Sequence, residues 1–528
     1  MNTKKILITD AIEQSCIDIL SRAGFVVDAK FGIKKDEILK IIGEYDGLVV
    51  RSGTTVTKEI ISASNKMKVI GRAGVGVDNI DVEAATQKGI IVMNAPSGNT
   101  ISTAEHTLSL LLSLTRLIPQ ANKSLQDGKW ERKKFLGSEL LHKTIGVVGL
   151  GRIGREVVIR CQAFGMHIIG YDPVMNIEVA KKIGIELVSI DEIFSRSDFI
   201  TFHVPISDAT KNLICEESIK KCKTGVRIIN CARGGIVNEK ALFDGLESNK
   251  IGGAALDVFE TEPPENNPLI NHPKVVATPH LGASTEEAQE KVAILIAEQM
   301  VDALENNSVR GAVNADALQC GITKEIKPFL LLAQKIGSLH SQILNGVIKE
   351  VKIQINGEIL HNFNSLLTAD VLKGILSNLM SDTINYVNAK FIAEAHGLKI
   401  ITETDKANEI YNNLISVILT TDKETKIISG TVFGNENLRI VEMDNFLVEF
   451  NPEGEILIYK NIDKPGMLAK VGGVLASNQI NIAGLSLGRI GIGKTALTIV
   501  NVDSPIPKNV ISEIQTIDGI SETRTVKI

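Results

Sequence analysis

The sequence predicts an α/β protein with two doubly wound parallel sheets in its first 312 residues, then an α+β region and a smaller α+β domain. Strand patterns alternate with helix patterns along the first half, which is typical of parallel sheets covered by helices on both faces. A glycine-rich turn in mid-chain joins a strand pattern directly to a helix pattern. Residues 455–528 follow the order strand, helix, strand, strand, helix, strand, which is typical of a ferredoxin-like domain.

The first predicted unit covers residues 1–97 and contains one parallel sheet. A glycine-rich run at 71–78 follows a strand near the end of this unit, but it carries a charged residue, so we do not interpret it as a phosphate-binding turn. The expected strands lie at 6–9, 25–28, 48–51, 69–72 and 90–94, and a helix is expected at 11–23.

The glycine turn in mid-chain has the spacing of a dinucleotide-binding fingerprint. In its run GLGRIG, Gly149 permits the tight turn, Gly151 lets the backbone approach a pyrophosphate, and Gly154 allows close helix–strand packing. The start of the following helix offers free N–H groups to phosphates. Asp172 stands about 20 residues further on, where a carboxylate accepts hydrogen bonds from the adenosine ribose and repels a 2′-phosphate. The pattern predicts a Rossmann-type site for NAD rather than NADP.

Three polar side chains follow consecutive strand patterns after this turn. They are Arg233, Glu262 and His280. Ligands of open parallel sheets bind beyond the carboxyl ends of the strands, so we expect these side chains to converge near the nicotinamide. A histidine can take the proton of a C2 hydroxyl, a carboxylate can orient it, and an arginine can hold a substrate carboxylate with two hydrogen bonds. The set predicts hydride transfer at a 2-hydroxy acid.

Each of these residues also has a structural interpretation. A single histidine at a strand end is more often structural than catalytic. Arg233 can be a loop charge before two glycines, and Glu262 a turn residue before two prolines. Their order and spacing behind one dinucleotide fold favour the catalytic interpretation.

The order of the motifs GLGRIG, CARGG, DVFETEPP and TPHLGAST resembles the D-isomer-specific 2-hydroxy-acid dehydrogenases. The N-terminal runs VRSG, RAGVGVDN and NAP, the run DGKWERKK and the C-terminal half resemble the long-chain branch of that family. The resemblance implies NAD-dependent oxidation of 3-phospho-D-glycerate to 3-phosphohydroxypyruvate, the first step of phosphorylated L-serine synthesis. Two alternatives stay open. One is the same chemistry on another small acid such as glyoxylate or lactate, and the other is an NAD-sensing regulator without turnover.

The resemblance also implies roles for individual residues. Arg233, Glu262 and His280 form the catalytic set. Val75 and Val204 depart from the small polar residues usual near the cofactor, so side-chain contacts are not expected there. Substrate contacts fall on Arg51, Ser52, Gly53 and Arg72, with Arg132 contributed by a neighbouring subunit. Cofactor contacts fall on Gly149, Gly151, Arg152, Ile153, Gly154, Asp172, Cys231, Ala232, Arg233, Asp257, His280, Gly282 and Ala283.

The same resemblance divides the chain into four domains. The substrate-binding domain is discontinuous, because the helix after Ser284 returns to complete it. The expected domains are residues 1–97 with 285–312 (substrate binding), 98–284 (NAD binding), 313–452 (intervening) and 453–528 (ACT).

The run at 459–468 resembles the strand-to-helix turn of an ACT domain, a small module that binds amino acids. Asp463 would meet a ligand's ammonium group, and Asn481 would supply a side-chain amide, with L-serine as the expected effector. The alternative is that both are ordinary turn residues in a dimeric sheet. The resemblance implies a homodimer or homotetramer.

The composition narrows the function class. A net charge of −5 without long runs of like charge gives no basis for a nucleic-acid partner. The six cysteines form no C-x-x-C pair and the nine histidines show no ligand spacing, which predicts reduced thiols and no metal site. The chain starts directly with a strand pattern, and its most apolar helix is too short to span a bilayer, so we expect no membrane partner and a cytoplasmic location.

Overall fold

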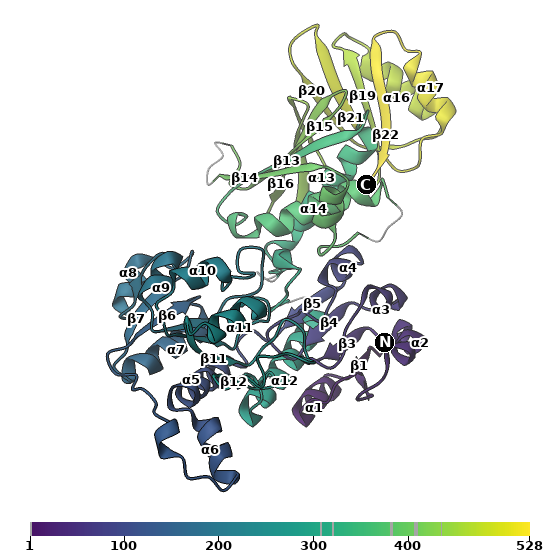
Figure 1. Ribbon diagram of the computed structural model, residues 1–528. Coiled ribbons are helices and arrows are strands. Elements are labelled where there is room, and N and C mark those ends of the chain that lie inside the picture. The colour runs from purple at the N-terminus through teal and green to yellow at the C-terminus, as the bar shows by residue number, and fades with distance from the viewer. Residues whose placement is uncertain (1–2, 307–308, 319–321, 381–383, 406–409, 435) are drawn as a thin grey trace.

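The computed structural model describes residues 3–306, 309–318, 322–380, 384–405, 410–434 and 436–528. Four sheets organise these residues, and Figure 1 shows the two parallel-sheet units side by side, with the two C-terminal units at one end of the molecule. The predicted fold class is confirmed. No helix within the described part of the chain is long and apolar enough to cross a membrane.

The first sheet has five parallel strands in the order β2-β1-β3-β4-β5. A helix from far along the chain, α12 (Glu286–Val301), packs against α1 and β4 of this unit. Gly71 allows this approach, because a Cβ there would lie 2.8 Å from Met300 Sδ. The strands are β1 (Lys5–Ile8), β2 (Val26–Ala29), β3 (Gly47–Val50), β4 (Val69–Arg72) and β5 (Ile91–Asn94), and the helices are α1 (Gln14–Arg22), α2 (Lys35–Ile41), α3 (Lys58–Ala63) and α4 (Val82–Gln87).

The second sheet has seven parallel strands in the order β12-β11-β10-β9-β6-β7-β8. The strand order reverses direction between β6 and β9, which is where a doubly wound sheet forms its ligand crevice. The strands are β6 (Thr144–Val148), β7 (His167–Tyr171), β8 (Glu186–Leu187), β9 (Phe199–Phe202), β10 (Val226–Asn230), β11 (Ile251–Leu256) and β12 (Val275–Ala277). The helices are α5 (Thr100–Arg116), α7 (Arg152–Ala163), α8 (Ile177–Lys182), α9 (Ile190–Arg196), α10 (Glu216–Lys221) and α11 (Glu239–Glu247).

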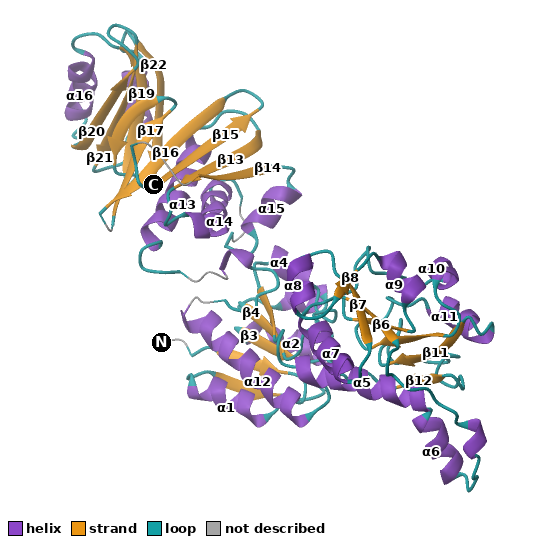
Figure 2. Ribbon diagram, turned by 90° about the vertical axis from the view of Figure 1, so that its left-hand side faces the viewer, coloured by secondary structure: helices purple, strands orange, loops and turns teal. Residues whose placement is uncertain are grey.

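An arm projects from this second unit. It begins with α6 (Ile118–Gln126), continues through a short 3₁₀ turn at Arg132–Lys134, and lies apart from the rest of the molecule in Figures 1 and 2. Its Trp130 and Leu136 side chains are 77% and 88% exposed. Large apolar side chains this exposed on one arm are typical of a surface that another chain covers.

The third sheet is mixed, with the order β14-β13-β15-β16-β17-β18. Only β13 and β14 pair in parallel. The sequence patterns identify only two of these six strands, at 351–356 and 446–450. Of the other four, β14 (KIITETD) has no buried residue, and β16 and β17 mix polar with apolar side chains. The strands are β13 (Ile348–Asn356), β14 (Lys399–Asp405), β15 (Leu414–Thr421), β16 (Thr425–Phe433), β17 (Asn437–Met443) and β18 (Phe446–Phe450), and the helices are α13 (Lys327–Ile343), α14 (Asn364–Ser377) and α15 (Ala389–Ala395).

The fourth sheet is antiparallel, with the order β20-β21-β19-β22, and α16 and α17 complete the unit. This strand order is the one that a ferredoxin-like chain of strand, helix, strand, strand, helix and strand adopts. The elements are β19 (Glu455–Ile462), α16 (Met467–Ser477), β20 (Ile482–Arg489), β21 (Thr495–Val502), α17 (Lys508–Gln515) and β22 (Ile520–Lys527).

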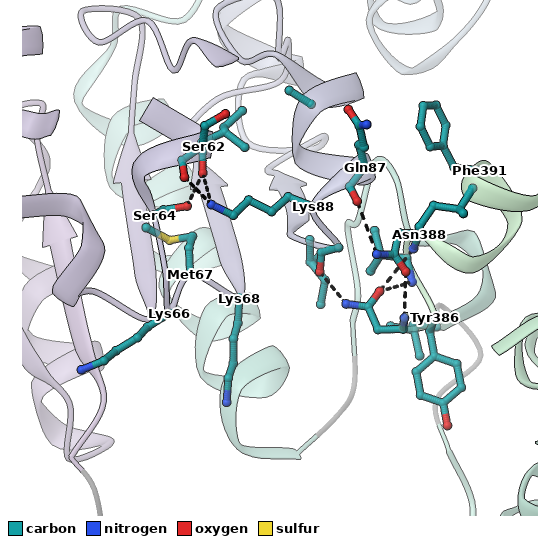
Figure 3. Close-up of a pocket in the computed structure, with 18 of the residues that line it drawn as sticks. Ser62, Ser64, Lys66, Met67, Lys68, Gln87, Lys88, Tyr386, Asn388 and Phe391 are labelled. Atoms are coloured by element: carbon teal, nitrogen blue, oxygen red, sulfur yellow. Dashed lines mark hydrogen bonds between the residues drawn. The ribbon is translucent and has the colours of Figure 1, made fainter. Parts of the chain in front are cut away.

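A cavity of about 1270 Å³ lies at the junction between the first and third units, and Figure 3 shows part of its lining. Two amides bridge the junction. Asn385 Nδ2 donates to the Gly89 carbonyl (2.9 Å), and Asn388 Nδ2 donates to the Gln87 carbonyl (3.4 Å). The ammonium group of Lys88 is occupied by two carbonyl groups at the end of α3. This cavity is therefore a domain junction, away from the crevice of the second sheet.

Candidate active site

His280 and Glu262 come together at the carboxyl end of the second sheet. His280 Nδ1 donates to Glu262 Oε2 at 2.7 Å, which leaves Nε2 as the free nitrogen of the ring. The imidazole is 51% exposed, so this second nitrogen can reach a ligand. The hydrogen bond to Glu262 raises the pKa of His280, and the charges of Glu262 and Asp257 add to it, while burial and Arg233 oppose it. The pair therefore stabilises a protonated imidazole.

Glu262 is held in its ionised form. Burial acts to raise the pKa of Glu262, but the hydrogen bond and charge of His280, with the N–H of Phe259 on Oε1 at 3.1 Å, outweigh it and lower that pKa. A carboxylate in this position fixes the histidine tautomer and stabilises the positive charge that develops when the ring takes a proton.

Asp257 organises the loop that carries His280. The side chain is only 1% exposed. Its Oδ1 accepts from Thr278 Oγ1 at 2.6 Å and from the N–H of Leu281 at 2.8 Å, and its Oδ2 accepts from the N–H of Gly282 at 2.9 Å. Burial opposes ionisation, but these donors and His106 lower the pKa of Asp257. Asp257, predicted as a cofactor contact, is thus occupied by groups of the protein itself.

Arg233 lies between the two parallel-sheet units. Its Nε lies 3.0 Å from Asp78 Oδ2 in the first unit, and its Nη1 donates to the Ala232 carbonyl at 2.7 Å. Gly234 is required behind it, because a Cβ there would lie 1.8 Å from the Phe259 carbonyl oxygen. The guanidinium of Arg233 therefore reaches from the second unit to Asp78 and Gly76 of the first.

Arg72 of the first unit lies close to both Arg233 and Arg51. Burial lowers the pKa of Arg72, and the positive charges of Arg233 and Arg51 lower it further, while Asp78 and Asp10 oppose this. Arg72 Nε donates to Asn79 Oδ1 at 3.3 Å, and Arg51 Nη1 donates to the Ala11 carbonyl at 3.1 Å. Mutual repulsion among three cations is relieved by an anion, so this cluster suits a ligand with more than one negative group.

The loop after β3 carries the other predicted substrate contacts. Ser52 and Gly53 are exposed there. Asp10 shapes the loop, since its Oδ2 accepts from the N–H of Arg51 and its Oδ1 accepts from Thr54 Oγ1 at 2.6 Å. Gly53 packs against that carboxylate, because a Cβ would lie 2.9 Å from Asp10 Oδ1. The loop is thus fixed close to the arginines.

The glycine loop has the shape that a dinucleotide needs. Gly149 adopts φ +92°, and a Cβ at Gly154 would lie 2.1 Å from the Gly149 carbonyl oxygen. Gly151 precedes α7 and has open space where a Cβ would stand. Nothing in the protein requires a glycine at that position, so the open space fits a phosphate group close to the backbone. Arg152 and Ile153 begin the helix behind it.

Asp172 stands at the end of β7, next to this loop. Its Oδ2 accepts from the N–H of Leu150 at 2.8 Å, and its Oδ1 accepts from the N–H groups of Val174 (2.9 Å) and Met175 (3.1 Å). A carboxylate has about four acceptor positions, so capacity for a ribose hydroxyl remains. These residues fit NAD.

The remaining predicted cofactor residues line the same edge of the sheet. Cys231 follows β10, and burial raises the pKa of its thiol to about 12, so it stays neutral. The N–H of Ala232 donates to Asn230 Oδ1 at 3.1 Å. Gly282 and Ala283 continue the loop after His280.

Arg132 is the one predicted substrate residue that the fold places outside this crevice. It lies exposed on the projecting arm, in the turn after α6. A contact with substrate therefore requires a second subunit.

Two histidines near the site were not predicted. His203 follows β9 beneath the glycine loop, and burial lowers its pKa to about 4, so it is neutral. Its position at the end of an expected strand is a signal that identifies it. His106 lies on α5, and its Nε2 is 3.1 Å from Asp257 Oδ1. No local motif marks His106 in the sequence, because the contact joins residues far apart in the chain.

The predicted effector residues lie in the fourth unit, each with its own partner. Arg489 Nη1 lies 3.2 Å from Asp463 Oδ2, and Asn481 Nδ2 donates to Asp503 Oδ2 at 2.6 Å. They lie at opposite ends of β20: Asp463 contacts Arg489, the last residue of this strand, and Asn481 directly precedes Ile482, the first. The structure brings each to the surface but does not join them to one another through these contacts.

The sequence predicts reduced thiols and no metal site for the whole chain, and the structure bears on the described residues of it. Five cysteines are free, and the sixth, Cys320, lies outside the described residues. No group of three or more potential metal ligands occurs within the described ranges.

Three family models match the chain. They are the NAD-binding domain of D-isomer specific 2-hydroxyacid dehydrogenases over residues 108–282, the D-3-phosphoglycerate dehydrogenase intervening domain over 325–444, and the ACT domain over 456–519. The cofactor of the matched domain is NAD, in agreement with the shape of the glycine loop.

Solved structures similar to the first two units include a glyoxylate reductase from Paecilomyes thermophila, with 30% identity and a TM-score of 0.55 over 59% of this chain and 99% of that one. A D-lactate dehydrogenase from Aquifex aeolicus, complexed with NAD and lactic acid, has 27% identity and a TM-score of 0.52 over 57% of this chain and 96% of that one.

Curated relatives extend over nearly the whole chain. D-3-phosphoglycerate dehydrogenase of Methanocaldococcus jannaschii is 44% identical over 99% of this chain and 100% of its own length. The enzyme of the same name from Bacillus subtilis is 40% identical, with 99% coverage of both. The chain is an NAD-dependent oxidoreductase and belongs to the D-3-phosphoglycerate dehydrogenase family, within the D-isomer-specific 2-hydroxyacid dehydrogenases.

Proposed function

We propose that the protein oxidises 3-phospho-D-glycerate to 3-phosphohydroxypyruvate with NAD, the first step of phosphorylated L-serine synthesis. The observation that carries this is the His280–Glu262 pair, at 2.7 Å, together with Arg72 of the first unit, which lies close enough to Arg51 and Arg233 for their charges to lower its pKa. The pair supplies the acid–base chemistry, and the arginines supply charge for both a carboxylate and a phosphate.

The residues of the site have separate roles in this reaction. Arg233 holds the substrate carboxylate with two parallel hydrogen bonds, and Arg51 and Arg72 hold the phosphate. Bound NAD supplies the hydride acceptor. His280 Nε2 takes the proton of the C2 hydroxyl, and Glu262 stabilises the resulting imidazolium through Nδ1. Asp257 keeps the loop in place for this transfer.

We propose the following assignments for the other predicted positions. Ser52 and Gly53 contact the substrate, and Arg132 reaches the site of a second subunit from the projecting arm. The exposed Trp130 and Leu136 of that arm support a homodimer or homotetramer. The domain boundaries proposed above, at residues 97, 284, 312 and 452, and a cytoplasmic location belong to the same proposal.

The fourth unit is proposed to bind L-serine at Asp463 and Asn481. A carboxylate suits the ammonium group of an amino acid, and an amide suits its carboxylate group. Because the two side chains lie at opposite ends of β20, one serine meets both only where two copies of this unit pair. Serine should lower the rate of the wild-type enzyme, and Asp463→Ala should abolish this effect. Asp518→Ala is the matched control, because this acidic residue of the same unit is paired with Lys464. Wild-type activity that ignores serine would contradict the assignment.

The substrate assignment is tested by steady-state kinetics with 3-phospho-D-glycerate, D-lactate and, in the reverse direction, glyoxylate. We expect a clear preference for the phosphorylated acid. A preference for an unphosphorylated acid would refute the substrate, and His280→Ala with unchanged NAD-dependent turnover would refute the catalytic assignment.

A further inference from the structure

His280 has an unusual backbone conformation for a residue with a side chain. Its φ is +56°, in the left-handed region, which a non-glycine residue keeps only where the surrounding structure enforces it. The enforcing contacts come from Asp257. Its carbonyl accepts the N–H of His280 at 2.9 Å, and its carboxylate accepts the N–H groups of Leu281 and Gly282.

The carboxylate of Asp257 depends in turn on helix α5. His106 Nε2 lies 3.1 Å from Asp257 Oδ1 and 3.2 Å from Thr278 Oγ1. Thr278 itself donates to the same carboxylate oxygen, and an ionised carboxylate only accepts, so Nε2 of His106 is a donor and carries the ring proton. One turn earlier on the same helix, Thr103 Oγ1 donates to the Gly282 carbonyl at 3.0 Å.

We propose that His106 is a positioning residue for the catalytic histidine. It acts through Asp257, whose buried carboxylate ties the loop 278–282 to α5 and holds His280 against Glu262. A carboxylate that is 1% exposed has no water to replace a lost donor, so removal of the His106 N–H leaves it under-satisfied. The loop then relaxes, and the His280–Glu262 hydrogen bond weakens.

This inference rests on the proposed catalytic role of His280, but its first test does not need a substrate. An NMR titration follows the His280 imidazole, identified as the signal lost in His280→Gln. The charged groups that act on it are Glu262, Asp257 and Arg233. In His106→Leu the pKa of His280 should fall toward the ordinary value of about 6.5, by roughly half a pH unit or more.

Three companion variants sharpen this test. His106→Gln places an amide N–H near the Nε2 position and should restore the wild-type titration. Ser109→Ala removes a hydroxyl from the same helix that donates to the Glu105 carbonyl, and should leave the His280 titration unchanged. If His106→Leu does not fold, His106→Phe keeps a ring of similar volume without the donor. An unchanged His280 titration in the Leu or Phe variant, or an equal shift in the Gln variant, would overturn the proposal.

The second readout is turnover. His106→Leu should lower kcat about 10- to 100-fold, as expected when a catalytic group is displaced, while KM for 3-phosphoglycerate changes by less than about threefold. A raised KM together with a lowered kcat, neither restored by His106→Gln, would indicate that His106 is merely structural and would overturn the proposal. Absence of turnover in the wild type would instead refute the proposed function and leave the titration as the deciding test.

Discussion

The substitution Glu262→Gln isolates the charge of the carboxylate at the active site. Glutamine has nearly the same shape, and its amide oxygen can still accept the Nδ1–H of His280. The hydrogen bond can therefore survive at about the 2.7 Å found here, while the negative charge is lost. Because that charge and hydrogen bond raise the pKa of His280, the pKa should fall toward about 6.5 in the variant.

The size of the effect follows from Coulomb's law. Two unit charges about 4 Å apart interact by about 1 kcal/mol in water and about 4 kcal/mol at an effective dielectric constant of 20. Both side chains are more than a third exposed, so we take about 1–2 kcal/mol after solvent screening. If this stabilises the imidazolium in the transition state, kcat should fall about 5- to 30-fold.

The assay is the initial rate of NADH formation from 3-phospho-D-glycerate across the pH range. His280 must be deprotonated to accept the hydroxyl proton, so kcat/KM falls on the acid side of its pKa. In Glu262→Gln the acid limb of the kcat/KM profile should move to lower pH, and the plateau value of kcat/KM above this limb should fall. An unmoved acid limb, or a kcat within about twofold of the wild type, would refute the idea that Glu262 acts through the charge of His280.

Three further predictions follow from the geometry. Arg72→Ala should raise KM for 3-phosphoglycerate about 10- to 100-fold through the loss of a charge-assisted hydrogen bond, and steady-state kinetics with an unchanged KM would contradict the phosphate assignment. Gly151→Ala should weaken NADH binding, measured by fluorescence titration, and leave the thermal unfolding midpoint unchanged, because the added Cβ meets no protein atom. Gly154→Ala should lower the thermal unfolding midpoint, because its Cβ meets a backbone oxygen. Melting curves that show the same midpoint for both variants would contradict this difference. Because the pKa of His280 is raised in the folded state, the His280–Glu262 pair stabilises the fold fully below about pH 6.5, and this stabilisation is lost as the pH rises through the folded pKa. Because the pKa of Glu262 is lowered, the stabilisation from its carboxylate is lost only as the pH falls through that lowered pKa. Denaturant unfolding should therefore show that Glu262→Gln lowers the free energy of unfolding more at pH 5.5 than at pH 8.5. An equal decrease at both pH values would contradict the upward direction of the His280 pKa shift.

The grouping of the predicted catalytic residues could be predicted from the sequence, because parallel strands place their carboxyl ends at the same edge of a sheet. The expected strands before Arg233, Glu262 and His280 are β10, β11 and β12, which are neighbours in the second sheet. The glycine loop was predictable for a similar reason, since the positive φ of Gly149 and the contact at Gly154 impose residue types that are visible in the sequence.

Other features depend on contacts between distant segments and leave no local pattern. His106 acts on Asp257 from 151 positions away, and α12, which begins at Glu286, packs on β4, which ends at Arg72. The role of Asp257 also needed the structure, because the sequence does not reveal that its carboxylate is occupied by Thr278, Leu281 and Gly282. In the third unit, a strand such as β14, which has no buried residue, resembles a loop when only apolar runs are counted.

Arg51, Arg72 and Arg233 should make the site select a phosphorylated 2-hydroxy acid. The most direct test compares kcat/KM for 3-phospho-D-glycerate with that for D-lactate under saturating NAD, in the wild type and in Arg72→Ala. We predict a large preference for the phosphorylated acid that shrinks in the variant. Equal values for both acids in the wild type, or a preference that the arginine substitution leaves intact, would contradict it.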